Sequence, residues 1–584
     1  MKVKSARKAR IGSRELRLAA MPLAALLYVT NAPSHAQDAR ATVAGVVTLP
    51  EPTVEHVSVE WAIEGDSNNN GVVSMRFRAE GETAWRQGMP LRRIPAGSNE
   101  GRSWRNRHSG SLFGLRPNTA YTIELTLADP EGGSATRQVS VRTRGVPTPG
   151  TGAVRAATPA TLATVLGQAM PGDIVELAAG NYAGFTINRD GAAGRPLTLR
   201  GLPGAVINGE IGLFTRRHVI LKSLTVNGRI RFNGSDDIAV LDCVVNASST
   251  YAGDGIVAYT RAARSYIAGN TINGLTIWRA SAFGVSGDNR GEGIAVTGPG
   301  HVVTRNRLRG FRDGISFMED GGAVDQYSLD VLGNEISDSA DDGIEADFCE
   351  HNCRIIGNHL TNSFIAFSAQ PSLGGPTYFI RNQAYNVAHV PFKLYRGSIG
   401  DVVLHNTIVK HGDGLNAYSG RPISRALFRN NLFLGGPGGT FNGYTSGSGR
   451  VVDAATVDMS NSSLDYNGYG TTLSDFNGRI GAVSFSGVSE LTSKTSEKHG
   501  IRVGYSVFAN AVAFPADPTH RYAPVWLGLA AGSAAIDRGE RIPNINDGFG
   551  GNGPDLGAVE LASPGGGQSG GSMPFRSGFE DAAP

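Results

Sequence analysis

The hydrophobic residues of this chain fall in short runs between turn residues, and they rarely recur at the spacing of an α-helix. Val57–Trp61 alternates apolar and polar positions, and Val72–Phe77 follows a turn-rich stretch, which is typical of strands. Thr161–Met170 differs, because its leucines and valine share one face, and it predicts a short helix before a strand at 174–177. The pattern predicts a protein that is mostly β.

An asparagine followed by a short apolar step recurs along the middle of the chain, which is the strongest repeat in the sequence. From Asn334 to Asn430 its period is 24 residues, four times in succession. The repeated residues are Asn270, Asn306, Asn334, Asn358, Asn382, Asn406 and Asn430.

A period of this length holds three short strands and three turns, and it lacks a helical apolar stripe. It therefore predicts an all-β fold whose body is a right-handed parallel β-helix with one rung per period. The asparagines are expected to be structural, because asparagine tolerates the left-handed conformation of tight turns and stacked amides can hydrogen-bond from rung to rung.

The region before the repeat resembles a fibronectin type III domain, with Trp61 on an early strand and Tyr121 after the turn Leu115-Arg-Pro117. A spacer or docking role is favoured for it over sugar binding. The linker 147–152 should end this domain, and 532–560 resembles the closing segment of many bacterial β-helix proteins, so it is expected to cap the last rung. The predicted organisation is a signal peptide at 1–36, a β-sandwich at 45–146, a parallel β-helix at 153–561 and a Gly/Ser-rich tail at 562–584.

The first 36 residues have the build of a secretory signal, with seven basic residues, an apolar run and Ser34-His35-Ala36. The apolar run is too short to span a membrane, and no later run is longer, so we expect a secreted, periplasmic or cell-surface protein without a membrane span. Removal of the signal leaves 47 basic and 50 acidic residues, so the basic excess is lost. We expect no binding of nucleic acid and a monomeric protein.

Three cysteines are too few for a disulfide scaffold. A disulfide between Cys349 and Cys353 is favoured over free thiols, and a zinc site is the least favoured reading because a second pair of ligands at finger spacing is missing. Cys243 lies in an apolar strand and is expected to be buried.

A second repeat places an acidic residue before glycine and an inward apolar residue on successive rungs. Because strands alternate their faces, Glu345 and Asp347 should point outward if Ile344 points inward. The same pattern puts Ala366 and Ser368 outward on the next rung, Lys393 and Tyr395 on the rung after, and Asn416 and Tyr418 beyond them. Glu345 and Lys393 would then lie about 10 Å apart across a shallow strip, two rungs from each other.

Four of these acids would repel one another unless a cation joined them, namely Asp313, Asp341, Asp342 and Glu345. Clustered carboxylate oxygens suit Ca²⁺, although a solvated acidic face is nearly as well supported. Lys393 faces these acids as an isolated cation on a neutral strand. A lysine that is partly desolvated can lose its proton and act as a base, and a solvated surface lysine is the alternative.

These residues resemble the family-nine pectate lyases, β-helix enzymes with an Asp-Asp-Gly-x-Asp calcium motif and a later lysine base. The matching segments are Asp341–Glu345, Asp313 and Phe392–Leu394. Glu345 stands where the family has aspartate, and Tyr395-Arg396 stands where two glycines are usual. These departures leave the identity of the substrate polymer undecided.

The resemblance implies a calcium-assisted β-elimination on a uronic-acid-containing polysaccharide. Lys393 would be the base and Arg396 a second catalytic residue. Substrate contacts are expected from Tyr395, Tyr418, Arg421 and Asp347.

Other functions fit parts of the same pattern. A β-helix glycoside hydrolase also uses an Asp-Asp pair, although the Gly-His-Gly signature of galacturonases is missing. An alginate or glycosaminoglycan lyase is as well supported as a pectate lyase, since 172–201 resembles the opening of chondroitinase-B-like chains. A surface β-helix that binds glycans without cleaving them is the non-enzymatic alternative.

Overall fold

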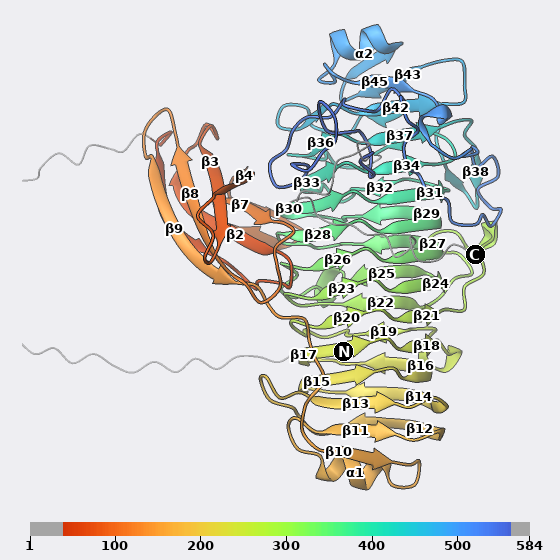
Figure 1. Cartoon of the computed structure of the whole chain (residues 1–584). Helices are drawn as coiled ribbons and strands as arrows, with labels where there is room; N and C mark the ends of the chain where they lie inside the picture. The colour runs from red at the N-terminus through yellow and green to blue at the C-terminus, as the bar shows by residue number, and fades with distance from the viewer. Residues whose placement is uncertain (1–38, 418, 562–584) are drawn as a thin grey trace, which may run out of the picture. The chain divides into compact units, whose positions relative to one another are not determined.

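The computed structural model describes residues 39–417 and 419–561. The predicted signal peptide, Tyr418 and the Gly/Ser-rich tail lie outside the described residues. The described residues pack as one unit that is nearly all β, with two α-helices, α1 (Leu162–Gln168) and α2 (Val488–Lys494). Long stacks of parallel strands establish the predicted parallel β-helix (Figure 1). No helix among these residues is both long enough and apolar enough to cross a membrane.

The N-terminal β-module, defined here as residues 42–142, is a seven-stranded sheet with the order β1-β2-β7-β4-β3-β8-β9. Trp61 and Tyr121 are buried in its core, and the Tyr121 hydroxyl accepts a hydrogen bond from the backbone N–H of Arg116 at 2.8 Å. The type III assignment stays a prediction. The strands are β1 (Thr42–Thr48), β2 (Val57–Gly65), β3 (Val72–Ala79), β4 (Arg86–Ile94), β7 (Arg107–Leu112), β8 (Ala120–Ala128) and β9 (Ala135–Arg142), and a separate hairpin joins β5 (Gly97–Asn99) to β6 (Arg102–Trp104).

One long sheet of the β-helix contains thirteen parallel strands. They are β10 (Val154–Ala157), β11 (Ile174–Leu177), β13 (Leu197–Gly201), β15 (Arg217–Lys222), β17 (Asp236–Leu241), β20 (Tyr266–Ala268), β23 (Val302–Thr304), β26 (Asp330–Leu332), β28 (Cys353–Ile356), β30 (Leu373–Ile380), β33 (Ile399–Leu404), β36 (Leu427–Arg429) and β41 (Ser463–Asp465).

The second long sheet contains seventeen strands and bends around a corner, so that its longer strands belong to two faces. They are β12 (Gly180–Ile187), β14 (Ala205–Leu213), β16 (Thr225–Arg231), β18 (Val244–Asn246), β19 (Ile256–Val257), β21 (Thr271–Asn273), β22 (Glu292–Val296), β24 (Arg307–Phe311), β25 (Asp313–Phe317), β27 (Glu335–Glu345), β29 (His359–Ser368), β31 (Gln383–Val387), β32 (Phe392–Lys393), β34 (Thr407–Val409), β37 (Leu432–Gly435), β42 (Gly468–Thr471) and β45 (Ile501–Val503).

A ladder of buried asparagine side chains runs along the β-helix. The Nδ2 of Asn334 donates to Oδ1 of Asn358 at 2.9 Å, and the Nδ2 of Asn358 donates to Oδ1 of Asn382 at 3.0 Å. Each Oδ1 also accepts the backbone N–H of the preceding asparagine, so every polar atom of the amide is satisfied in the core. The ladder links Asn270, Asn306, Asn334, Asn358, Asn382, Asn406, Asn431 and Asn467, and it ends on the carboxylate of Glu497.

Two details of the predicted repeat are wrong. The ladder passes through Asn431 rather than Asn430, because Asn430 occupies the turn position before it with a φ of 61°. The left-handed residue of each turn is the one that precedes the ladder asparagine, such as Arg305 or Arg381. The asparagines are therefore selected for amide stacking and not for the turn conformation.

The two α-helices lie at opposite ends of the stacked strands (Figure 1). Helix α1 buries Leu162 and Leu166 where the sequence predicts a helix. At the other end, Leu491 of α2 is buried in the same core as the rungs, with a small sheet of β35 (Leu415–Asn416), β40 (Val452–Ala454), β43 (Asn477–Ile480) and β44 (Val483–Ser486) beside it. Helix α2 thus covers the last rungs, and the prediction that 532–560 forms this cap is wrong.

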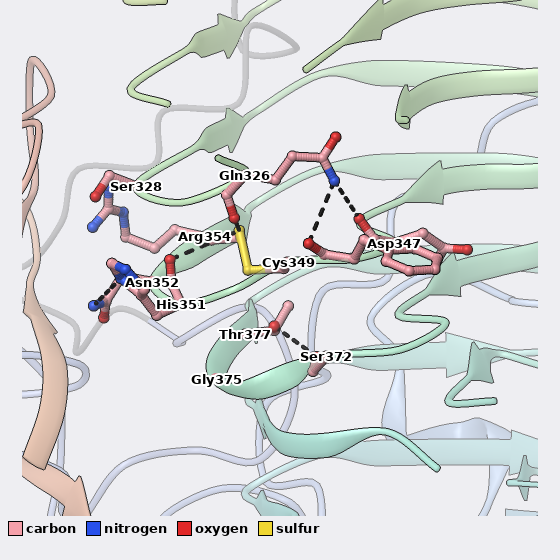
Figure 2. Close-up of a disulfide and its surroundings, with 12 residues drawn as sticks. Gln326, Ser328, Asp347, Cys349, His351, Asn352, Arg354, Ser372, Gly375 and Thr377 are labelled. Atoms are coloured by element: carbon pink, nitrogen blue, oxygen red, sulfur yellow. Dashed lines mark hydrogen bonds between the residues drawn. A yellow bond between two sulfur atoms is a disulfide. The ribbon is translucent and has the colours of Figure 1, made fainter. Parts of the chain in front are cut away.

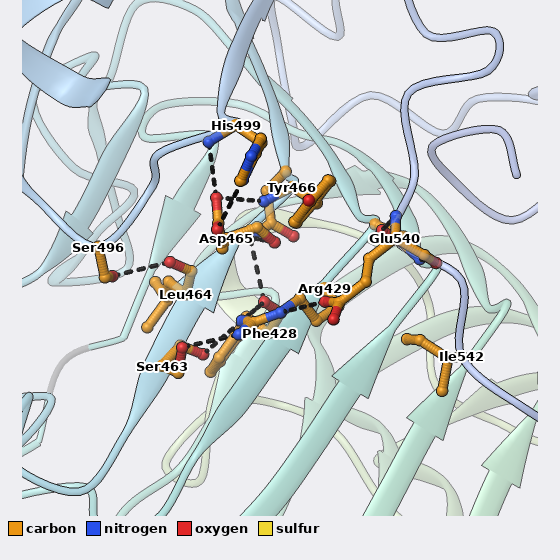
Figure 3. A network of polar contacts seen from close by, with 12 residues as sticks. Phe428, Arg429, Ser463, Leu464, Asp465, Tyr466, Ser496, His499, Glu540 and Ile542 are labelled. Atoms are coloured by element: carbon orange, nitrogen blue, oxygen red, sulfur yellow. Dashed lines mark hydrogen bonds and ion pairs between the residues drawn. The ribbon is translucent and has the colours of Figure 1, made fainter. Parts of the chain in front are cut away.

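The C-terminal segment instead returns along the outside of earlier rungs. Glu540 pairs with Arg429 at 2.7 Å, close to the stacked rings of Tyr466 and His499 (Figure 3). The backbone N–H of Ala558 donates to Thr407 at 2.8 Å. These contacts cover strand faces that would otherwise be exposed.

Replacing Asn358 with alanine should destabilise the β-helix strongly, because it removes the acceptor of the Asn334 backbone N–H and of one Nδ2 hydrogen of Asn334 in the core. We expect a loss of about 3 kcal/mol in the free energy of unfolding, measured by chemical denaturation. Asn227→Ala is the matched control, since Asn227 belongs to an exposed asparagine ladder and should cost about 0.5 kcal/mol or less. Equal costs for the two variants would show that the buried ladder does not hold the rungs.

Candidate functional site

The register of three strands brings the predicted site residues into one column. Glu345 of β27 pairs with Ser368 of β29, and Ser368 pairs with Lys393 of β32. The prediction that Ser368 separates Glu345 from Lys393 is therefore confirmed. Ala366 is completely buried in the core, so its predicted outward position is wrong. Asn416 pairs with Asp453 of β40, and its position on the rung after Lys393 stays a prediction.

A column of stacked acids lies beside this one. Glu292 pairs with Asp313, and the carboxylate of Asp313 accepts the backbone N–H of Asp342 at 2.8 Å. Asp313 and Asp342 are at most 3% exposed, so solvent screens their charges poorly. This column needs positive charge nearby to be stable.

Lys393 supplies that charge from two rungs away. Its Nζ lies 2.5 Å from Oδ2 of Asp342 and 3.4 Å from Oε1 of Glu345. The predicted spacing of about 10 Å holds for the strands that carry Glu345 and Lys393. The amine and the carboxylates lie much closer, because the extended lysine side chain reaches across the small Ser368. The amine is thus held in a buried ion-pair network and does not lie on an open strip.

The acids divide into two clusters with Lys393 between them. Asp313, Asp341 and Asp342 bring one carboxylate oxygen each within 4.8 Å of one another, and Glu319, Glu345 and Asp347 do the same. The predicted calcium set is therefore split, with Glu345 in the second cluster. Two buried oxygens, one on Asp342 and one on Asp347, have no hydrogen-bond partner.

Burial and mutual repulsion shift the pKa values of these groups. Burial raises the pKa of Asp341 to about 7, and the neighbouring Asp342 adds to the shift. Burial likewise raises the pKa values of Asp313 and Glu345 well above their usual range. Burial lowers the pKa of Lys393, but Asp342 and Glu345 outweigh it, so that this pKa lies well above its ordinary value. The lysine is therefore an ammonium ion here.

Asp347 lies in the interior, contrary to the outward position that the sequence predicts. It is fully buried, and its Oδ1 accepts hydrogen bonds from the Ser368 hydroxyl at 2.6 Å and from the backbone N–H of Gln370. The chain then turns into the disulfide between Cys349 and Cys353, and the amide of Gln326 donates to the Asp347 carbonyl (Figure 2). The disulfide and this hydrogen bond fix the strand end that carries Asp347.

The two predicted arginines lie at the edge of the site, and both are paired with acids. Arg396 contacts Oδ1 of Asp320 at 2.6 Å and lies 3.7 Å from Glu319 of the second cluster. Arg421 forms an ion pair with Glu100. Burial raises the pKa of Tyr395 to about 12, so the half-buried phenol keeps its proton.

Several residues of the site are absent from the set predicted from the sequence. Arg312 lies 3.3 Å from Asp313 and 3.7 Å from Asp341, and it could have been found because it directly precedes Asp313. Glu319 lies in a loop without a periodic pattern, and Glu100 belongs to another module, so neither carries a local signal. These three residues complete a row of alternating charge from Arg312 to Glu100.

No family model and no curated protein sequence matches this chain. An alginate lyase of polysaccharide lyase family 6 aligns with a TM-score of 0.35 and 14% identity over 56% of this chain, and the alignment covers 53% of that enzyme, about half its length. A family 28 exopolygalacturonase of Yersinia enterocolitica aligns with a TM-score of 0.33 and 10% identity, covering 74% of this chain and 96% of that one. A mannuronic-acid-specific family 6 lyase from human gut microbiota gives 0.24 and 16%, covering 56% and 78%.

Asp341→Asn should stabilise the protein at high pH but not at low pH. The folded pKa of Asp341, about 7, lies above the ordinary 3.8, so stability falls as pH rises through this window, and asparagine avoids the cost. Without divalent cations, we expect the variant to melt at least about 2 °C above the native protein near pH 8.

That gain should shrink toward zero near pH 4, and the matched variant of the exposed Asp475, Asp475→Asn, should show no such pH dependence. A gain that is the same at both pH values would contradict the raised pKa of Asp341.

Proposed function

We propose that this protein is an exported polysaccharide lyase that cleaves a uronic-acid-containing polysaccharide by β-elimination. The observation that carries the proposal is the position of Lys393, a nearly buried amine between two acidic clusters that contain two unpartnered carboxylate oxygens. Buried charge of this density is costly for stability, and such groups gather at functional sites.

The first acidic cluster has ligands that suit a calcium ion. Asp313, Asp341 and Asp342 offer hard oxygen ligands at close spacing, and the free Oδ1 of Asp342 is an acceptor without a donor. A bound calcium would neutralise the carboxylate of a uronic acid and acidify the proton on the adjacent carbon.

Lys393 is the proposed base. As a free amine it would take the proton from the carbon beside the uronate carboxylate, and the released electron pair would form a carbon–carbon double bond. The bond between the next carbon and the glycosidic oxygen would break in the same elimination. Because the acids hold Lys393 as an ammonium ion, part of their charge must be compensated before it can accept a proton.

Tyr395 would complete the reaction. Its pKa of about 12 keeps the phenol protonated near neutral pH, so that it can protonate the departing oxygen. Arg396 and Arg421, partly exposed at the edge of the site, would pair with carboxylates of other sugars in the chain.

Lys393→Arg should abolish elimination without removing the buried positive charge, because a guanidinium does not act as a base near neutral pH. We expect the rate to fall by about a thousandfold or more on whichever of polygalacturonate, alginate and chondroitin the native protein cleaves. The readout is the ultraviolet absorbance of the new double bond, and Lys222→Arg, at an exposed ion pair, should keep full activity. A fully active Lys393→Arg would contradict the assignment.

Calcium should bind to the native protein and much more weakly to Asp341→Asn, because the variant loses one charged ligand of the first cluster. Isothermal titration calorimetry with calcium chloride measures this without any substrate. Asp475→Asn should bind calcium as the native protein does. Equal binding by all three proteins would place calcium elsewhere.

Glycoside hydrolysis is the second candidate, favoured by the Asp341–Asp342 pair. An acid with a pKa of about 7 can protonate a leaving oxygen, while an adjacent carboxylate activates water. A hydrolase would produce reducing ends without the ultraviolet absorbance. Glycan binding without either product would instead support a non-catalytic surface protein.

A further inference from the structure

A hairpin of the N-terminal β-module reaches the edge of the candidate site. Strands β5 and β6 pair through Asn99 and Arg102, and the turn between them consists of Glu100 and Gly101. Asn99 donates from Nδ2 to the carbonyls of Arg396 and Gly397, at 3.0 Å in both cases. The hairpin therefore holds the chain segment that directly follows Lys393.

Further contacts anchor both sides of this hairpin. Arg102 donates to the carbonyl of Asp320 at 3.1 Å and also to that of Ala323. The ring of Trp104 packs on Phe348 and Leu373. The loop that carries Glu319 is thus fixed from the same side as Arg396, so the hairpin contacts both segments that border the second acidic cluster.

Glu100 occupies a turn position that suits another kind of residue. Glu100 and Gly101 have φ values of 47° and 74°, so both residues of the two-residue turn are left-handed. Asparagine, aspartate and glycine are the favoured residues at the first of these positions, and a longer side chain there is strained. Strain of this kind points to a role for the side chain itself.

The carboxylate of Glu100 lies between two guanidinium groups. It forms an ion pair with Arg421, and its Oε2 lies 3.9 Å from Arg396, whose shorter contact is with Asp320 at 2.6 Å. The Arg421 side chain is 50% exposed and that of Arg396 is 31% exposed, so both remain accessible from solvent. Two arginines around one carboxylate form a binding site for any carboxylate of similar geometry.

We propose that Arg396 and Arg421 form a carboxylate subsite for the acidic polysaccharide, and that Glu100 is its internal ligand. This inference rests on the proposed function and adds to it a specificity determinant from the N-terminal β-module. A uronate of the polymer must displace the Glu100 carboxylate to enter the subsite. The module thereby weakens binding of acidic chains at this subsite and acts as a built-in competitor.

The test is the dissociation constant of an acidic hexasaccharide, an oligogalacturonate or an oligoalginate, measured by calorimetry for four proteins. Glu100→Gln removes the competing charge, and we expect it to bind about three- to tenfold more tightly than the native protein, a gain of about 1 kcal/mol. Arg421→Gln should bind more weakly, and adding Glu100→Gln to Arg421→Gln should restore little, because the freed site is gone.

Glu82→Gln is the matched control, since Glu82 forms an exposed ion pair with Arg116 within the same module and should leave binding unchanged. Melting temperatures of all variants show whether they fold. Weaker or unchanged binding by a folded Glu100→Gln, while the native protein binds, would overturn the subsite and leave the proposed function standing. An absence of binding by every folded variant would overturn both.

Discussion

The register between neighbouring rungs is the constraint on which the rest of this structure depends. The buried asparagine ladder fixes it, because each amide can satisfy its donors and acceptors only when successive rungs are aligned. A slip of one residue would exchange the inward and outward faces of a strand. Lys393 would then enter the core and Phe392 would leave it. The contacts of the site thus follow from a structural repeat that has no chemistry of its own.

Electrostatics determines what the aligned side chains can do. Burial of the two acidic clusters raises the pKa values of Asp313, Asp341 and Glu345, and repulsion between neighbouring carboxylates adds to the shifts. Lys393 offsets part of the cost of burying these carboxylates, and Arg312 and Arg396 at the edges of the row offset a further part. A site of this kind gains stability when a cation binds or when acidic groups take up protons.

Much of this arrangement can be predicted from the sequence, because the repeat period gives the rung and the alternation of faces gives the outward residues. The stacking of Glu345, Ser368 and Lys393 follows from counting alone. Other features depend on packing that leaves no local pattern. The burial of Asp347 results from a turn closed by a disulfide, and the contact of Glu100 with Arg421 joins residues 321 positions apart.

The most direct test of β-elimination by Lys393 is whether an oxygen atom from water enters the product. The native protein would digest its acidic polymer in water enriched in heavy oxygen, and mass spectrometry would follow the product ends. Elimination predicts unsaturated ends, no uptake of solvent oxygen during cleavage, and loss of these products in Lys393→Arg. Incorporation of one heavy oxygen at each cleaved bond, with no unsaturated sugar, would show hydrolysis and contradict the account.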